Sequence, residues 1–187
     1  GEIGEEALKR KFLSNSGLSD RIVDWAGSLE SAINKLNNSN IAPLTAETLK
    51  IRDEFIYKND FTSFIFDYAK QFKKADIIVI SAPYWDLSFP ALLKTYFENI
   101  NVTGITFEYT KEGLPKGLCN AKKMFYITTS GGPILSDEFG FGYVKALSNL
   151  LYGIENIEYI KAQGLDIYGA DIDKILKTAK DDIDKLF

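Results

Sequence analysis

Three stretches of the chain carry the apolar residues that are typical of buried β-strands. Residues 76–80 are β-branched after the first position and show no alternation of apolar and polar side chains. Residues 124–128 have the same character, and residues 157–160 form a more polar version of it. Strands of a parallel sheet that lies under helices have this pattern. The sequence therefore predicts a parallel sheet with buried strands.

Five further segments carry apolar side chains at helical spacing. In one of them Ser88 is a candidate N-cap, and Pro90 stands in the first helical turn, where proline is favoured. In another, which ends at Gly153, we expect five residues to face inward: Tyr143, Val144, Leu147, Leu150 and Leu151. The five predicted helices are 45–56, 60–74, 88–100, 141–152 and 172–186. Their alternation with the strands predicts an α/β fold.

Two parts of the chain depart from this alternation. Residues 104–110 predict a short excursion, half of a hairpin, that is closed by Gly113. In residues 1–40 we expect no apolar strand; instead Ser19 is a candidate cap for a helix with Ile22 and Val23 on its apolar face. There is no internal repeat and no linker, so we interpret residues 1–187 as a single domain.

The composition excludes several classes of protein. The net charge of −4 argues against a nucleic-acid-binding protein, and no apolar run is long enough to cross a membrane. A single cysteine, Cys119, suits a cytoplasmic protein. The chain has no histidine, which excludes a Ser-His-Asp hydrolase and a zinc site with histidine ligands. Any chemistry must come from carboxylates, hydroxyls, lysines or a bound cofactor.

Two unusual loops follow predicted strands, and in a parallel sheet both open on the same edge. The first offers aromatic surface and backbone N–H groups, and the second offers hydroxyls and two adjacent glycines that let a ligand approach the backbone. Together they suit a flat heterocycle with polar edges, such as a flavin, which would supply redox chemistry. The candidate binding residues are Tyr84, Trp85, Asp86, Leu87, Thr129, Ser130, Gly131 and Gly132.

Each feature also has a simpler structural interpretation. The two glycines also suit an ordinary turn, and Tyr84 and Trp85 suit the boundary of a core. For Asp86 we favour a local role as a cap of the following helix. Cys119 has no neighbouring base in the sequence and is interpreted as a core or boundary residue rather than a nucleophile.

The segments ADIIVISAPYWDLSFPALLKTYFENI (75–100) and VTGITFEYTKEGLPKGLCNAKKMFYITTSGG (102–132) resemble a known enzyme family. They are similar to the FMN-dependent NAD(P)H oxidoreductases of the azoreductase and quinone-reductase group. That family has an apolar strand, a Pro-Met-Tyr-Asn-Phe-like loop, a proline that opens a helix, a Gly-x-Thr-Phe-x-Tyr excursion and a strand that ends in Ser-x-Gly-Gly. The resemblance runs from Pro43 to the C-terminus. It implies a flavodoxin-like fold, a doubly wound parallel sheet with helices on both faces.

The resemblance also implies a function. Residues 84–87 would line the isoalloxazine ring of FMN, mainly through backbone groups, and residues 129–132 would contact its other polar edge. The reaction would be ping-pong: NADH or NADPH reduces FMN, and FMN then reduces a quinone, azo or nitro compound, with no catalytic acid or base from the protein. The family is usually homodimeric, and Phe107 and Tyr109 lie in the excursion that would face the second subunit.

The N-terminal part departs from the family, so we interpret residues 1–40 as divergent or incomplete. The family begins with an apolar strand and a serine-rich loop for the FMN phosphate. Here the candidates for a degraded phosphate loop are Ser14, Ser16 and Ser19. Two alternative functions follow: a flavodoxin-like binding or dimerisation module with weakened or lost FMN binding, and an electron-transfer flavodoxin that does not use NAD(P)H.

Overall fold

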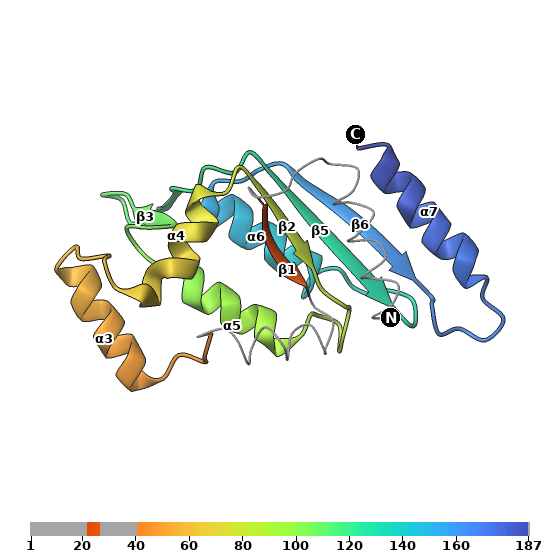
Figure 1. Cartoon of the computed structure of the whole chain (residues 1–187), viewed down its shortest axis with the longest axis horizontal. Helices are drawn as coiled ribbons and strands as arrows, with labels where there is room; N and C mark the ends of the chain where they lie inside the picture. Colours follow the sequence, from red (N-terminus) through yellow and green to blue (C-terminus); the bar gives the residue numbers. More distant parts are fainter. Residues whose placement is uncertain (1–21, 27–40, 187) are drawn as a thin grey trace.

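Four parallel strands form the main sheet of the protein (Figure 1). The computed structural model describes residues 22–26 and 41–186. The strands are β1 (Ile22–Ala26), β2 (Ile77–Ser81), β5 (Lys123–Ser130) and β6 (Ile157–Gln163), in the order β1-β2-β5-β6. All neighbouring pairs are parallel. The carboxyl ends of the strands therefore lie at one edge of the sheet, which is the edge where ligands bind in open α/β sheets.

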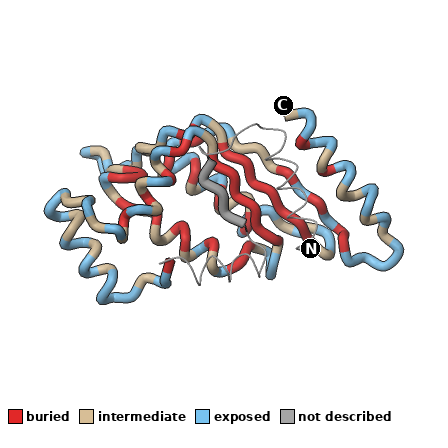
Figure 2. Tube along the Cα trace, in the orientation of Figure 1, coloured by how far each residue is buried: buried red, intermediate tan, exposed pale blue. Residues whose placement is uncertain are grey.

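Helices cover both faces of this sheet. On one face Ile80 and Tyr126 pack in a core with residues of α4 and α5, and on the other face Val79 and Phe125 pack with Ile183 of α7. Figure 2 shows the buried inner strands between these layers. The helical elements are α3 (Ala46–Tyr57), η1 (Phe64–Phe66), α4 (Asp67–Lys74), α5 (Ala91–Ile100), α6 (Phe141–Leu147), η2 (Ser148–Tyr152) and α7 (Ile172–Asp184). The prediction of a doubly wound α/β fold is confirmed. None of the helices in the described part of the chain is long and apolar enough to span a membrane.

The predicted excursion is an antiparallel hairpin beside the main sheet. It consists of β3 (Phe107–Tyr109) and β4 (Pro115–Gly117). Phe107 is buried within its own chain, whereas the side chain of Tyr109 is 59% exposed. Of this pair Tyr109 therefore presents its ring to solvent, and the expectation that the excursion faces a second subunit stays a prediction.

The N-terminal part contains a strand where we expected a helix. Ile22–Ala26 pairs in parallel with Ile77–Ser81 and forms β1, so the prediction of no strand among the first 40 residues is wrong. A five-residue segment with β-branched and aromatic residues fits the helical period and the strand period equally well. Pairing with β2 makes it a strand. The candidate phosphate residues Ser14, Ser16 and Ser19 lie outside the described residues.

The helix that ends at Gly153 differs from its prediction in its inner face. The α-helix α6 stops at Leu147, and the wider π-helical turn η2 follows. This turn changes which side chains face the core, so that Tyr152 is buried and Leu150 is 63% exposed, contrary to prediction. Gly153 ends the helix with a φ of 74°, as its predicted role as a stop requires.

Candidate functional site

The first predicted loop forms a tight hairpin at the carboxyl end of β2. The N–H of Trp85 donates to the carbonyl of Ser88 (3.0 Å), and the N–H of Ser88 donates back to the carbonyl of Trp85 (2.7 Å). Asp86 and Leu87, at the tip, have positive φ angles of 50° and 68°. Two consecutive positive φ angles are typical of a type I′ turn, which usually contains glycine or asparagine. The left-handed conformation costs roughly 1–2 kcal/mol per residue with a side chain.

This hairpin overturns the expected cap of α5. The helix begins at Ala91 with Pro90 as its N-cap residue, and no side chain caps it. Ser88 instead donates from its hydroxyl to the carbonyl of Phe139 (2.6 Å), and Asp86 is exposed in the turn. The prediction that Ser88 or Asp86 caps the helix is wrong because the hairpin reverses the chain before the helix begins.

The second predicted loop is held against the loop that follows β6. The carbonyls of Ser130 and Gly131 accept hydrogen bonds from the N–H groups of Leu165 (3.1 Å) and Asp166 (2.9 Å). A Cβ atom at Gly131 would overlap the carboxylate of Asp166, whereas one at Gly132 would meet nothing within 4 Å. A side chain at Gly131 would thus have to displace the exposed Asp166 carboxylate, whereas Gly132 leaves an open approach to its backbone.

The structure brings the two predicted loops together. The N–H of Tyr84 donates to the carbonyl of Thr129 (2.9 Å), and the hydroxyl of Tyr84 donates to the carbonyl of Ser136 (3.1 Å). The side chains of Thr129 and Ser130 are buried, and the Ser130 hydroxyl donates to the carbonyl of Gly132 (2.6 Å). These two residues therefore present little more than backbone at this edge, and their hydroxyls are not open to a ligand.

Two segments that the sequence interpretation missed complete this edge of the sheet. Residues 133–140 are joined to the first loop by the bonds of Tyr84 and Ser88, and residues 164–168 are joined to the second by the backbone bonds of Gly131 and Gly132. Six large side chains of the four segments are exposed: Trp85, Leu87, Leu135, Phe139, Ile167 and Tyr168. Apolar residues in loops with no helical or strand period were the signal in the sequence. We call this set the apolar rim.

An Asp137 cluster fixes residues 133–140 to β6. The hydroxyl of Tyr159 donates to Oδ1 of Asp137 (2.8 Å), and Nζ of Lys161 lies 3.7 Å from Oδ2. The ring of Tyr159 stacks on that of Phe141 at a centroid distance of 4.2 Å. Burial, together with the bond to the Asp137 carboxylate, raises the pKa of Tyr159, so its hydroxyl remains a donor.

Comparison with known proteins identifies the family of this chain. A family model described as "Flavodoxin-like fold" matches residues 11–187. The chain belongs to this flavodoxin-like family. An FMN-dependent NADH:quinone oxidoreductase of Lachnoclostridium phytofermentans is 39% identical over 154 residues, which cover 81% of this chain and 77% of that protein. FMN-dependent NADH:quinone oxidoreductase 2 of Clostridium acetobutylicum is 45% identical over 118 residues, and that match spans 58% of the relative, less than two thirds of its length.

Solved flavodoxin-like structures agree with this assignment. The FMN-dependent NADH-azoreductase of Bacillus anthracis str. Ames Ancestor, solved in complex with FMN, has a TM-score of 0.67 and 26% identity, and the match covers 98% of this chain and 89% of that one. An azoreductase of Bacillus anthracis str. Sterne has a TM-score of 0.75 at 22% identity over 98% of this chain and 90% of that one. The second likeness supports the fold alone.

The described residues at the carboxyl edge fit a flavin ring. None of the described residues accepts a hydrogen bond from the N–H of Asp86, Leu87 or Gly132, so these donors are available to the polar edge of a ring. The exposed side chains of the apolar rim offer a wall for its flat face. The edge of this flavodoxin-like sheet thus combines available donors with apolar surface.

Proposed function

We propose that this protein is an FMN-dependent oxidoreductase that passes electrons from NADH or NADPH to a quinone, azo or nitro acceptor by a ping-pong mechanism. The relative that matches 81% of the chain at 39% identity is an FMN-dependent NADH:quinone oxidoreductase, and a solved neighbour at 26% identity is an FMN-dependent NADH-azoreductase. When bound, FMN would supply the redox chemistry that a chain without histidine lacks.

The observation that carries the proposal is the hairpin at residues 84–88. Its strained tip aims no side chain into the core, since Trp85, Asp86 and Leu87 are all exposed. The hairpin is nevertheless held in place at its base, where the N–H of Tyr84 donates to the carbonyl of Thr129 on β5. Strain of this kind is kept where the surrounding structure holds a functional conformation. In the proposal, residues 84–87 and 129–132 bind the ring, with Thr129, Ser130 and Gly131 contributing backbone and Gly132 the open approach.

The residues of the chain bind and orient rather than transfer protons. The apolar rim would exclude water from one face of the ring, and the available N–H groups of Asp86 and Leu87 would hold its polar edge. The carboxylate of Asp86 is exposed, so its charge is solvated. No catalytic side chain is proposed.

We also propose that the protein is a single-domain chain that works as a homodimer in the cytoplasm. Three exposed apolar side chains, Tyr109, Leu114 and Leu150, lie on neighbouring segments of the hairpin β3–β4 and of η2, and such surface suits a subunit contact. Burial raises the pKa of the half-buried Cys119 to about 12, so its thiol is a poor nucleophile at neutral pH.

Titration with FMN and a steady-state assay test the proposal. We expect the purified protein to bind one FMN per chain, and to oxidise NADH in the presence of menadione with the parallel-line kinetics of a ping-pong reaction. Gly132→Val should weaken FMN binding at least tenfold, because it places a side chain over the open backbone approach. Glu112→Val, at an exposed position in the β3–β4 turn, is the matched control and should bind FMN normally.

The alternatives predict different outcomes in the same experiment. A folded protein that takes up no FMN would reject the proposal in favour of a binding or dimerisation module. A protein that binds FMN but does not oxidise NADH or NADPH would be an electron-transfer flavodoxin. Equal FMN affinities of Gly132→Val and Glu112→Val would remove Gly132 from the site.

A further inference from the structure

A pocket lies between α3, η1 and the last turn of α5, on a part of the molecule that the proposed flavin edge does not use. Its volume is about 180 Å³. Most of its lining is apolar and includes Pro43, Leu44, Ile51, Phe64 and Ile65. Helix α3 has no buried residue, as its tan and pale-blue colours in Figure 2 show, and its contact with the core includes the partly buried Phe55 and Ile56.

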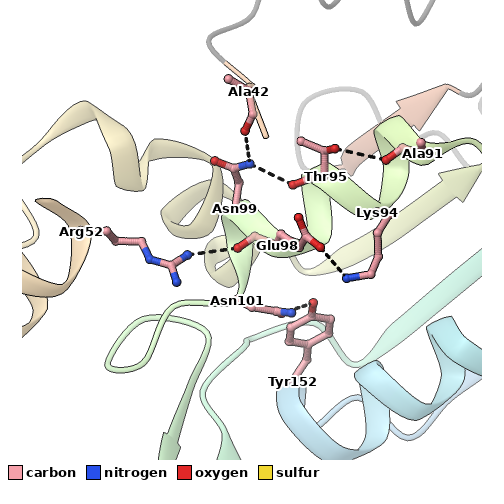
Figure 3. Close-up of polar contacts among 9 residues, drawn as sticks. All are labelled: Ala42, Arg52, Ala91, Lys94, Thr95, Glu98, Asn99, Asn101 and Tyr152. Atoms are coloured by element: carbon pink, nitrogen blue, oxygen red, sulfur yellow. Dashed lines mark hydrogen bonds and ion pairs between the residues drawn. The ribbon is translucent and has the colours of Figure 1, made fainter. Parts of the chain in front are cut away.

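One cation, Arg52, enters this apolar lining. Figure 3 shows its side chain reaching from α3 toward the end of α5, where Nη1 donates to the carbonyl of Glu98 (3.2 Å). The Nε atom of Arg52 is buried and has no hydrogen-bond partner among the described residues. A role as a cap for the carbonyl end of α5 explains the Nη1 bond, but it leaves the buried Nε donor unexplained.

The charge of Arg52 has no close counter-ion in the described part of the chain. No carboxylate there lies within 4.0 Å of its guanidinium, and the nearby Glu98 carboxylate is bound by Lys94 at 2.7 Å. Burial lowers the pKa of the Arg52 guanidinium, and the charge of Asp53 opposes this effect only in part. The pocket therefore holds a partly desolvated cation, which an anion would neutralise.

One wall of the pocket is fixed in place. Nδ2 of Asn99 donates to the carbonyl of Ala42 (3.0 Å) and to that of Thr95 (2.9 Å), which ties residues 42–44 to α5 (Figure 3). At the mouth, Ile51 and Phe64 are 45% and 65% exposed. The pocket is thus preformed on one side and open to solvent at its rim.

We propose that this pocket binds a small monoanionic carboxylate carried on an apolar ring or short chain. A guanidinium matches a carboxylate in shape and charge, and the apolar lining suits the body of the ligand. A cavity of roughly 150 Å³ holds benzene, so 180 Å³ accommodates a single ring with its carboxylate. Arg52 is the one cation among the lining residues, so the pocket offers too few donors for a phosphate dianion.

The pocket is separate from the flavin edge. Helix α5 begins at Ala91, next to the hairpin of residues 84–88, and Asn99 lies in its last turn. The 1.5 Å rise per residue places the two ends of this helix roughly 12–15 Å apart. Carboxylate binding therefore stands or falls independently of FMN binding.

Titration of the ¹⁵N-labelled protein with benzoate, followed by amide chemical shifts, tests the proposal. We expect saturable shifts at residues 42–52, 64–68 and 98–99, with benzamide, the neutral analogue of the same shape, binding at least tenfold more weakly. Arg52→Met keeps an apolar stem without the charge and should reduce benzoate affinity at least tenfold. Arg52→Lys keeps the charge but lacks the planar guanidinium, so its benzoate affinity should lie between those of the wild type and Arg52→Met. Lys50→Met, at an exposed position on the same helix, is the control and should bind benzoate normally.

Three outcomes would overturn the proposal. One is the absence of saturable shifts in the wild-type protein with its fold intact. Another is equal affinity of the wild-type protein for benzoate and benzamide, which would make the pocket a site for neutral apolar molecules. The third is loss of benzoate binding as protein concentration rises and a dimer forms, which would make the pocket part of a subunit interface.

Discussion

Leu87 has an unfavourable backbone conformation, and packing of its side chain does not offset the cost in free energy. Its φ is 68°, and the residue is 44% exposed. The preceding residue, Asp86, shares the conformation and is also exposed. A hairpin with asparagine and glycine at these positions would form without this strain. We infer that the two side chains are kept for what they do at the carboxyl edge rather than for the stability of the turn.

Replacing Leu87 by glycine should therefore increase the stability of the protein and weaken FMN binding. We expect Leu87→Gly to raise the free energy of unfolding by about 0.5–1 kcal/mol, because relief of the left-handed strain exceeds the entropic cost of glycine. FMN affinity should fall, since an apolar rim side chain is lost. Urea unfolding and FMN titration measure the two effects. Leu135→Gly is the control: its φ is not positive, so the same change there should lower stability.

At the scale of the element, polar contacts with β6 hold the segment 133–140, and the central one joins Asp137 to Tyr159. It has no regular backbone pairing of its own, and the bond between Tyr159 and Asp137 links it to the strand. The same residue 137 accepts from the N–H of Gly142 (2.6 Å) at the start of α6. Asp137 thus connects strand, loop and helix, and the exposed Leu135 and Phe139 of the apolar rim take their positions from it.

Removing either partner of this contact should loosen the segment. We expect Asp137→Ala and Tyr159→Phe each to cost about 1 kcal/mol of stability, and the double variant to cost clearly less than their sum, since the bond between the two side chains is lost only once. Asp137→Ala also removes the exposed ion pair with Lys161, which contributes little. Amide hydrogen exchange at residues 134–140 should accelerate in all three. Glu138→Ala, at the adjacent exposed position, is the control, and additive losses in the double variant would contradict a direct coupling.

The same contact has a defined dependence on pH. The folded pKa of Tyr159 is raised above its unfolded value of about 10, so the contribution is fully present below pH 10 and is lost as the pH rises through the folded pKa. The stability difference between wild type and Tyr159→Phe should therefore stay constant from pH 7 to 9.

Strands and loops were predictable to different degrees. The runs at 77–81 and 123–130 were predictable because strands buried on both faces need continuous apolar residues. Strand β1 was not predictable, since its five residues have no distinctive period and their strand conformation depends on pairing with β2. The outward position of Leu150 follows from a π-helical turn, which a regular 3.6-residue period cannot anticipate.

At the scale of the whole molecule, half of the candidate site followed from topology. The loops at 84–87 and 129–132 were predictable as neighbours because parallel strands end at a common edge. The positions of residues 133–140 and 164–168 at this edge were not predictable. They depend on hydrogen bonds between residues far apart in the sequence, such as the bond of Tyr84 with Ser136. The local conformation of Asp86 and Leu87 was also hidden, since neither residue type signals a left-handed turn.

The exposed surface formed by Tyr109, Leu114 and Leu150 gives the last prediction, on the oligomeric state. If this surface is the dimer contact, a lysine there places an unpaired charge in an apolar interface. We expect Tyr109→Lys to weaken self-association at least tenfold in analytical ultracentrifugation, and Leu150→Lys to do the same. Tyr57→Lys is the matched control, because Tyr57 is a tyrosine with 93% exposure on α3, outside this surface. A wild-type protein that remains monomeric at assay concentrations, or equal effects of Tyr109→Lys and Tyr57→Lys, would contradict the assignment of this surface.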